Sequence, residues 1–413
     1  MARSVLLAPF EVRAFRFQWP ADMLTSWGIE MEVLILGWYI LVETGSVWLL
    51  TVFGSLQYLG TLIAPVFGMA GDRFGHRRVL CAMRAFYALL SAVVMVLAFA
   101  GVLDPWYALG IAGLSGLVRP SDLAMRSALV AEMMPGERLM GAMGVSRTTS
   151  DSARILGSLF GATLLAFLGV GPAYLAITLF YAGGLALTYA MGSPPRRAHP
   201  PGYVRLSFPR EVSEGMAYVW RTPCLLAAMW IAFLVNIAAF PMTSGLLPYV
   251  AKDVYHIGQT GLGTLVASFS VGAFLGSIVV TLAGRALRPA RTMVIFTLAW
   301  FAMVLLFVQM PGPNSGRLML VLAGCAQSLS MVPLSAMLLH VAGERFRGRV
   351  MGVRMLAIYG LPLGLLAAGW LIERIGFVAM ASSYCVFGLI VTLAIAVHWR
   401  AAIWPLDVPA NQR

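Results

Sequence analysis

Residues 68–78 read Gly-Met-Ala-Gly-Asp-Arg-Phe-Gly-His-Arg-Arg and form a short basic segment between two long apolar stretches. The glycines allow tight turns and close approach of neighbouring helices. Asp72 would lie at a helix end, where a carboxylate can bind a helix N-terminus or an arginine. Arg73, Arg77 and Arg78 are typical of a cytoplasmic loop. The segment therefore predicts two membrane-spanning helices joined on the inner side of a membrane.

The composition extends this interpretation to the whole chain. Of 413 residues, 60% are hydrophobic and only 11% are charged, whereas a soluble domain carries about 25% charged residues. An ordinary soluble enzyme, a disordered chain and a collagen are thereby excluded. The apolar blocks are too long for the alternating strands of a β-barrel. We expect an all-α polytopic membrane protein.

The apolar blocks number twelve. A helix needs about 20 apolar residues to cross a bilayer, and twelve such helices with short loops fit the length of the chain. The expected spans are 17–42, 47–70, 79–101, 106–132, 140–168, 172–192, 224–249, 260–283, 292–310, 318–341, 350–372 and 377–399.

The net charge of +12 is explained better by membrane topology than by nucleic-acid binding. With a cytoplasmic N-terminus, basic residues gather on alternate loops, whereas the outer loops contain only Lys252, Arg317 and Arg374. We therefore expect both termini in the cytoplasm, no nucleic-acid partner, and a multi-pass protein of the bacterial inner (plasma) membrane.

The chain divides into two similar halves around one polar segment. Residues 193–222 are rich in Pro and Arg and predict a cytoplasmic linker, with an amphipathic helix over 211–221. The expected domains are thus a six-helix bundle over 1–192, the linker, and a second bundle with a short tail over 223–413. The segment Gly136-Glu-Arg-Leu-Met-Gly recurs as Gly343-Glu-Arg-Phe-Arg-Gly at the equivalent loop of the second half. Repeated six-span halves are typical of transporters with a site near the midplane.

The segment 68–78 resembles the signature loop of the major facilitator superfamily. Gly68, Asp72, Arg73, Gly75 and Arg77 match its Gly-x-x-x-Asp-Arg/Lys-x-Gly-Arg-Arg/Lys pattern, and the match departs where a histidine replaces the usual arginine. The resemblance implies an inner gate that holds the two halves closed, with Asp72 paired to a basic residue of the fourth helix. Arg126 is the candidate. The alternative is that the arginines of this loop only fix topology.

A narrower resemblance is to the drug:proton antiporter branch that includes macrolide efflux pumps and enterobactin-type siderophore exporters. It is carried by residues 126–140 and 146–157 and continues to about residue 174. The branch usually has Gly-Pro-x-x-Gly-Gly on the fifth helix. Here Ser158 replaces the proline and Ala162 replaces the last glycine, which departs from the antiporter pattern.

Two acids lie deep in the first span. An ionisable side chain at bilayer depth costs about 2.5–3.5 kcal/mol and therefore needs a partner or a role. Glu30 and Glu32 point about 200° apart around a helix, so only one can face a given neighbour. Because burial disfavours the charged form of a carboxylate, either acid is a candidate proton carrier. The alternative is a structural ion pair with an arginine.

The fourth and fifth spans supply candidate partners. Arg119 and Asp122 flank Pro120, which can bend the helix and expose carbonyls to a cavity. Arg119 could bind an anionic substrate or hold a glutamate of the first span. Asp151 and Arg154 share one helix face with Arg147, which fits either an ion-pair ladder or a transport role.

The second half is poorer in buried charge. Asn236 on the seventh span and Gln327 on the tenth are its main polar candidates, and they predict a polar but neutral cavity wall near helix-bending prolines. The small-xxx-small pairs Gly157/Gly161, Gly272/Gly276 and Gly360/Gly364 predict close helix packing.

These features lead to three hypotheses. The first is a proton-coupled exporter of amphipathic small molecules, drugs or a siderophore, acting by alternating access in which protonation of Glu30 or Glu32 weakens an ion pair with Arg119. The second is an uptake symporter or facilitator for an organic anion, and the third is a non-transporting receptor or assembly factor on the same fold. The sequence lacks a nucleotide-binding GxxxxGK[ST] loop, and it predicts no enzyme activity and no cofactor. The proton gradient would supply the energy for transport. The expected partners are a small-molecule substrate, protons and the lipid bilayer. We expect the protein to be a monomer.

Overall fold

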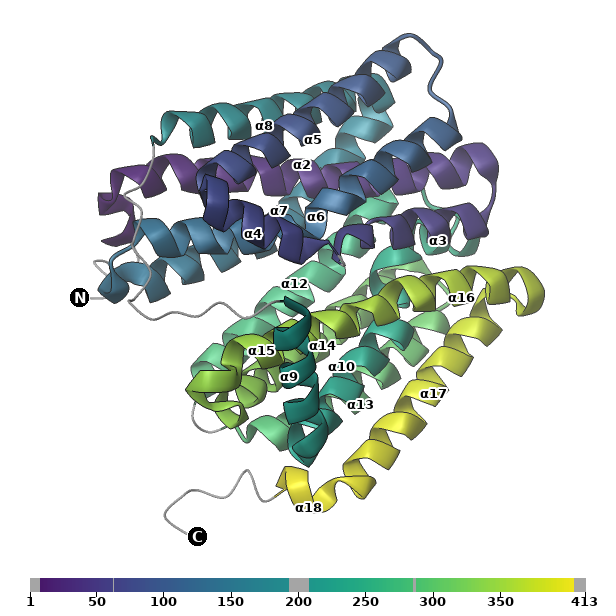
Figure 1. The fold of residues 1–413 in the computed structure, drawn as a ribbon. Coiled ribbons are helices and arrows are strands. Elements are labelled where there is room, and N and C mark those ends of the chain that lie inside the picture. Colours follow the sequence, from purple (N-terminus) through teal and green to yellow (C-terminus); the bar gives the residue numbers. More distant parts are fainter. Residues whose placement is uncertain (1–7, 62, 193–207, 285–286, 405–413) are drawn as a thin grey trace. The chain divides into compact units, whose positions relative to one another are not determined.

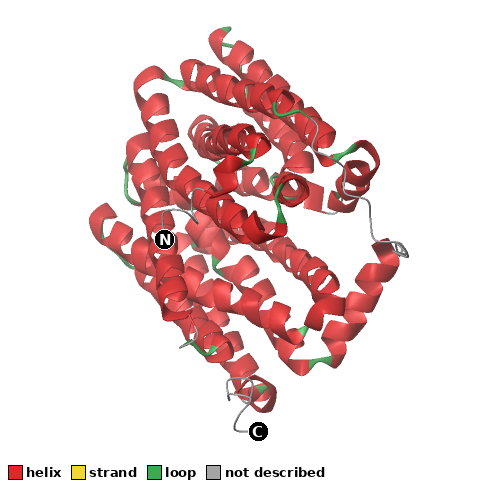
Figure 2. Ribbon diagram, turned by 90° about the vertical axis from the view of Figure 1, so that its left-hand side faces the viewer, coloured by secondary structure: helices red, strands yellow, loops and turns green. Residues whose placement is uncertain are grey.

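The computed structural model describes residues 8–61, 63–192, 208–284 and 287–404. Every regular element among them is a helix (Figures 1 and 2). Ten helices are long and apolar enough to cross a membrane, or eleven if the bent pair Val47–Thr61 and Val66–Phe74 is one span. The protein is therefore an all-helical polytopic membrane protein, as expected.

The twelfth expected span corresponds to α6 (Pro105–Met133), which has 29 residues but is not among the helices counted as apolar enough to span. Arg119, Asp122 and Arg126 lie within it and lower its hydropathy. At about 1.5 Å per residue the helix is still long enough to cross a bilayer of about 30 Å. Twelve spans therefore stay a prediction.

The described chain forms two compact units. Unit 1 groups Met1–Gly45, Leu56–Val204 and Gly258–Gly263. Its helices besides α6 are η1 (Ala8–Glu11), α2 (Arg13–Thr44), η2 (Leu59–Thr61), α4 (Ala64–Phe74), α5 (His76–Phe99), α7 (Gly136–Leu168) and α8 (Val170–Ala190). The long helix α2 packs against α6, α7 and α8, and α5 packs against α8. Helix α2 is thus the central helix of this unit.

Unit 2 groups Ser46–Ser55, Arg205–Ile257 and Thr264–Arg413. Its helices are α3 (Val47–Leu56), α9 (Phe208–Arg221), α10 (Pro223–Ala238), η3 (Pro241–Gly245), α11 (Leu247–Tyr249), η4 (Val250–Val254), α12 (Gln259–Ala283), α13 (Pro289–Val308), α14 (Pro313–Val341), α15 (Gly343–Leu356), η6 (Ala357–Tyr359), α16 (Gly360–Ile375), α17 (Phe377–His398) and α18 (Arg400–Ile403). Helix α13 packs against α14 and α17, and α10 packs against α16 and α17.

The small-xxx-small pairs lie at close helix contacts, as predicted. A Cβ atom added to Gly272 would lie 1.9 Å from the carbonyl oxygen of Val321, and one added to Gly364 would lie 2.1 Å from that of Ile237. A Cβ on Gly161 would lie 2.9 Å from the side chain of Met31. Only glycine fits where backbones approach this closely.

The linker contains a helix, as the amphipathic pattern predicts. Helix α9 covers Phe208–Arg221, whereas residues 193–207 lie outside the described residues. It packs against α15, where the rings of Tyr218 and Phe346 stack at 4.3 Å between centroids. The division into 1–192, 193–222 and 223–413 and the cytoplasmic position of both termini stay predictions.

Candidate functional site

The middle of α2 holds a buried ion pair. Glu32 is 4% exposed, and its Oε2 lies 3.4 Å from Nη2 of Arg119 on α6. The same oxygen accepts a 2.6 Å hydrogen bond from the hydroxyl of Tyr181 on α8. Oε1 accepts a 3.4 Å bond from the hydroxyl of Ser115, and Arg119 also donates to the side-chain carbonyl of Gln57. Glu32 and Arg119 are thus in contact. This contact fits the alternative in which Arg119 holds a glutamate of the first span.

Helical periodicity explains why this glutamate and not its neighbour meets α6. Ser115, Arg119, Asp122 and Arg126 are spaced at i, i+4, i+7 and i+11, so they share one face of α6. Helix α6 packs against α2, and Glu32 is on the side of α2 that meets this face.

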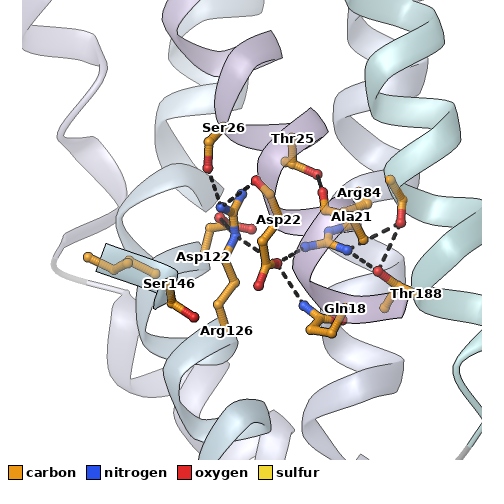
Figure 3. Close-up of polar contacts among 12 residues, drawn as sticks. Gln18, Ala21, Asp22, Thr25, Ser26, Arg84, Asp122, Arg126, Ser146 and Thr188 are labelled. Atoms are coloured by element: carbon orange, nitrogen blue, oxygen red, sulfur yellow. Dashed lines mark hydrogen bonds and ion pairs between the residues drawn. The ribbon is translucent and has the colours of Figure 1, made fainter. Parts of the chain in front are cut away.

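A second buried cluster lies nearer the start of α2 (Figure 3). Asp22 is 7% exposed and Arg84 of α5 is fully buried. Oδ1 of Asp22 binds Arg84, accepts a 2.7 Å bond from Gln18 and lies 3.6 Å from Nε of Arg126. The same Nε lies 2.5 Å from Oδ2 of Asp122. Two acids and two arginines therefore balance one another inside unit 1.

The arginines of this cluster also bind neutral groups, as Figure 3 shows. Arg84 donates to the carbonyl oxygen of Gly184 at 3.2 Å and to the hydroxyl of Thr188. Arg126 donates to the hydroxyl of Ser26 at 2.6 Å. The cluster thus ties α2, α5, α6 and α8 together.

Asp22 and Arg84 were not among the residues proposed from the sequence. The signal that singled out Glu30 and Glu32, an ionisable side chain inside an apolar span, also applied to these two residues. A uniform use of that rule would have found both. Their pairing would still have required the structure.

Glu30 has different surroundings. Its Oε1 lies 3.6 Å from Nε of Arg154 on α7, and the two side chains are 27% and 49% exposed. A Cβ on Gly157 would lie 3.1 Å from the Cβ of Glu30, so this glycine lets α7 pack closely against α2. Nε of Arg147 lies 3.2 Å from Oδ2 of Asp151. The expected ladder on α7 thus forms its first pair, whereas Arg154 pairs with α2.

The signature loop forms a tight turn that is tied to α8. Gly75 has a positive φ of +93° and both ends α4 and begins α5, which explains the need for glycine there. Arg77 donates to the carbonyl oxygens of Thr188 and Tyr189 at 3.2 and 2.9 Å, so it binds the exposed carbonyls at the end of α8. A Cβ on Gly68 would meet nothing within 4 Å, so close packing does not explain that position.

The acid of the loop pairs with a histidine. Asp72 Oδ1 lies 3.8 Å from Nε2 of His76, whose Nδ1 lies 2.6 Å from Oε1 of Glu132 on α6. Arg126 forms ion pairs with the two aspartates of the buried cluster in this structure, and its expected pairing with Asp72 stays a prediction. The guanidinium of Arg73 lies 5.4 Å from the centre of the adjacent Phe74 ring.

The candidate residues of unit 2 form hydrogen bonds with residues that are near them in the sequence. The amide nitrogen of Asn236 donates to the carbonyl oxygen of Ala232 at 2.8 Å, and the side-chain oxygen of Gln327 accepts a 3.5 Å bond from Ser328. Within the described residues, no three His, Cys, Asp or Glu side chains gather as metal ligands. The roles of all candidate residues stay predictions.

Ion pairs buried inside a bundle of helical spans are typical of multi-pass membrane proteins that move ions or substrates. The sequence profile of the Major Facilitator Superfamily matches residues 19–363 and 229–412. This chain belongs to the major facilitator superfamily, whose members are transporters and not enzymes.

Known proteins resemble the chain over most of its length. The multidrug efflux pump Tap of Mycolicibacterium fortuitum is 27% identical over 389 residues, which cover 88% of this chain and 91% of Tap. The enterobactin exporter EntS of Shigella flexneri is 25% identical over 315 residues, which cover 73% of this chain and 70% of EntS. The structure of the nucleoside transporter NupG superposes with a TM-score of 0.72 at 13% identity over 93% of this chain and 99% of NupG, a likeness of fold.

Proposed function

We propose that this protein exports amphipathic small molecules, drugs or a siderophore, across the bacterial plasma membrane in exchange for protons. The observation that carries the proposal is the buried ion pair between Glu32 and Arg119 in the middle of α2. A charge at this depth costs about 2.5–3.5 kcal/mol, so a pair of them is accounted for more readily by a role in transport than by packing.

The energy available from this pair is large enough to drive a conformational change. Protonation of Glu32 would leave Arg119 without its counter-charge. Removing one partner of a buried ion pair costs about 3–5 kcal/mol, and moving a two-state equilibrium from 1:99 to 99:1 requires about 5.5 kcal/mol. The two free energies are of the same order, so protonation of Glu32 would bias the equilibrium between the two states of alternating access.

The direction of transport rests on the relatives. Tap is a multidrug efflux pump and EntS is an enterobactin exporter, and both align with most of this chain. In the proposed cycle the two halves rock around a central site. Substrate and proton compete for binding to the transporter. A bound substrate favours the state in which Glu32 is ionised and paired with Arg119, and a bound proton favours the other state.

Uptake of an organic anion is the second candidate. It requires a cationic side chain that is available to the substrate. Arg119, Arg126 and Arg154 each have a carboxylate partner, so this structure favours the first proposal. A receptor or assembly role on the same fold would be indicated by a phenotype that is independent of every substrate.

Proton release from acid-loaded everted vesicles tests the proposal. A pH-sensitive dye reports recovery when ethidium, a macrolide or a siderophore is added to vesicles with the wild type, Glu30→Gln or Glu32→Gln. We expect recovery with at least one compound, and its loss in Glu32→Gln. Movement of labelled compound down its gradient without dye recovery would indicate a facilitator. No movement with any compound would reject the export proposal.

The remaining parts of the proposal concern the whole molecule. We propose that it works as a monomer without a cofactor, that two pseudo-symmetric bundles of six spans flank the linker, and that both termini are cytoplasmic. Reporter fusions at each terminus test the topology.

A further inference from the structure

Two buried charge clusters lie within unit 1. The first contains Glu32 and Arg119, and the second contains Asp22, Asp122 and Arg126 with their partners. Asp22 and Glu32 are ten residues apart on α2, about 15 Å along the helix axis. A proton can pass from one cluster to the other only if polar groups lie between them.

Tyr87 of α5 lies between them. It is 1% exposed, and its ring centre is 5.5 Å from that of Tyr181, whose hydroxyl donates to Glu32. The Tyr87 hydroxyl experiences the charges of Asp122, Arg119, Arg126 and Glu32, with that of Asp122 the strongest. These four charged residues belong to both clusters, and they lie on α2 and α6.

Two polar atoms on this route are buried and have no hydrogen-bond partner among the described residues: the hydroxyl oxygen of Tyr87 and Oδ1 of Asp122. An unsatisfied buried polar atom costs about 1–3 kcal/mol. A single water bound between them would satisfy both, since buried waters occupy sites with two to four polar neighbours.

We propose that Tyr87 carries protons between Glu32 and Asp122. Protonated Glu32 gives its proton to the Tyr181 oxygen while the Tyr181 hydroxyl proton moves to the Tyr87 oxygen, directly or through a water. Tyr87 passes its own hydroxyl proton through a water to Oδ1 of Asp122. Glu32 ends as a carboxylate and Asp122 as a carboxylic acid, and each tyrosine regains one proton, so no other reactant is needed.

The relay deepens the proposed function and rests on its proton coupling. It gives the proton a route inside unit 1, from Glu32 toward the end where α2 begins. The Asp22–Arg84 pair then has a positioning role, since it holds Arg126 and its partner Asp122 beside this route.

The test compares two tyrosines. Tyr87→Phe removes only the hydroxyl and keeps the ring against Tyr181. Tyr174→Phe is the matched control, because the Tyr174 hydroxyl is equally buried and unpartnered among the described residues but experiences the charges of Glu32 and Arg119 only. Melting temperatures in detergent establish that both variants fold. If Tyr87→Phe does not fold, Asp122→Asn removes the acceptor instead.

The readout does not require a known substrate. The full-length transporter in liposomes is jumped from acid to alkaline pH, and rapid-scan infrared spectroscopy follows the carboxylic acid band that is missing in Glu32→Gln. We expect Tyr87→Phe to slow the loss of this band at least about tenfold and Tyr174→Phe to match the wild type. Equal rates in Tyr87→Phe and the wild type would overturn the relay while proton coupling stands. Absence of any Glu32 band in the wild type would overturn proton coupling and the relay together.

Discussion

At the scale of single residues, Glu30 and Glu32 show how two acids of one helix come to lie in different surroundings. Glu32 is 4% exposed and has three partners, whereas Glu30 is paired with a half-exposed arginine of α7. The second pair is the more exposed of the two in this structure. The structure therefore favours the buried acid for the coupling role, a choice that the helix pattern alone left open.

The first prediction concerns the less buried acid, Glu30. Glu30→Gln is expected to change the free energy of unfolding by less than about 1 kcal/mol and to keep pH-dependent transport, because the half-exposed side chain of Arg154 can move away from a neutral neighbour. Thermal unfolding in detergent and dye recovery in vesicles measure the two effects. Loss of coupling in Glu30→Gln with retention in Glu32→Gln would reverse the assignment.

The second prediction concerns the fully buried pair of Asp22 and Arg84. Either Asp22→Asn or Arg84→Met is expected to destabilise the protein by about 3–5 kcal/mol, because each leaves an uncompensated buried charge. The double variant should be less destabilised than the sum of the two, with a coupling energy of about 0.5–3 kcal/mol. Arg147→Met, which breaks an exposed pair, is the control and should have little effect. Additive effects of the two changes would show that the pair does not act as a unit.

At the scale of elements, helix boundaries were largely predictable. The spans expected over 260–283 and 377–399 correspond to helices Gln259–Ala283 and Phe377–His398, because long apolar blocks bounded by turn residues leave little choice. The span expected over 47–70 is instead broken between α3, η2 and α4. Hydropathy indicates which residues lie inside the membrane, but it does not indicate where a helix bends.

The third prediction tests close packing between α12 and α14. A Cβ atom on Gly324 would lie 2.0 Å from the carbonyl oxygen of Phe269. Gly324→Ala is therefore expected to lower stability by at least about 1–3 kcal/mol, as overpacking does. Gly352→Ala on α15 is the matched control, since its Cβ would meet nothing within 4 Å, and alanine should stabilise that helix by about 0.5–1 kcal/mol. Similar melting temperatures for the two variants would contradict this packing.

At the scale of the whole molecule, the sequence was sufficient for the family, and it singled out Glu32, Arg119, Asp122 and Arg126 among the charged residues of the two buried clusters. The signature loop and the deep charges indicated a transporter and brought forward Glu32 and Arg119, because a charge inside an apolar span is costly and therefore needs a partner or a role. The pairing of Asp72 with Arg126 stays a prediction, since helical spacing alone does not decide which side chain of α6 reaches the loop. Asp22 and Arg84 could have been found by the same rule, but their pairing required the structure, because it depends on how α2 and α5 pack.

The central claim is that Glu32 gives up a proton when the transporter binds its substrate. The most direct measurement is proton release from the purified transporter in weakly buffered detergent solution, followed with a pH-sensitive dye as a compound identified in the vesicle assay is added. We expect the wild type to release protons when the compound is added, and Glu32→Gln to release none although the compound still binds. Equal proton release by the wild type and Glu32→Gln would contradict the account.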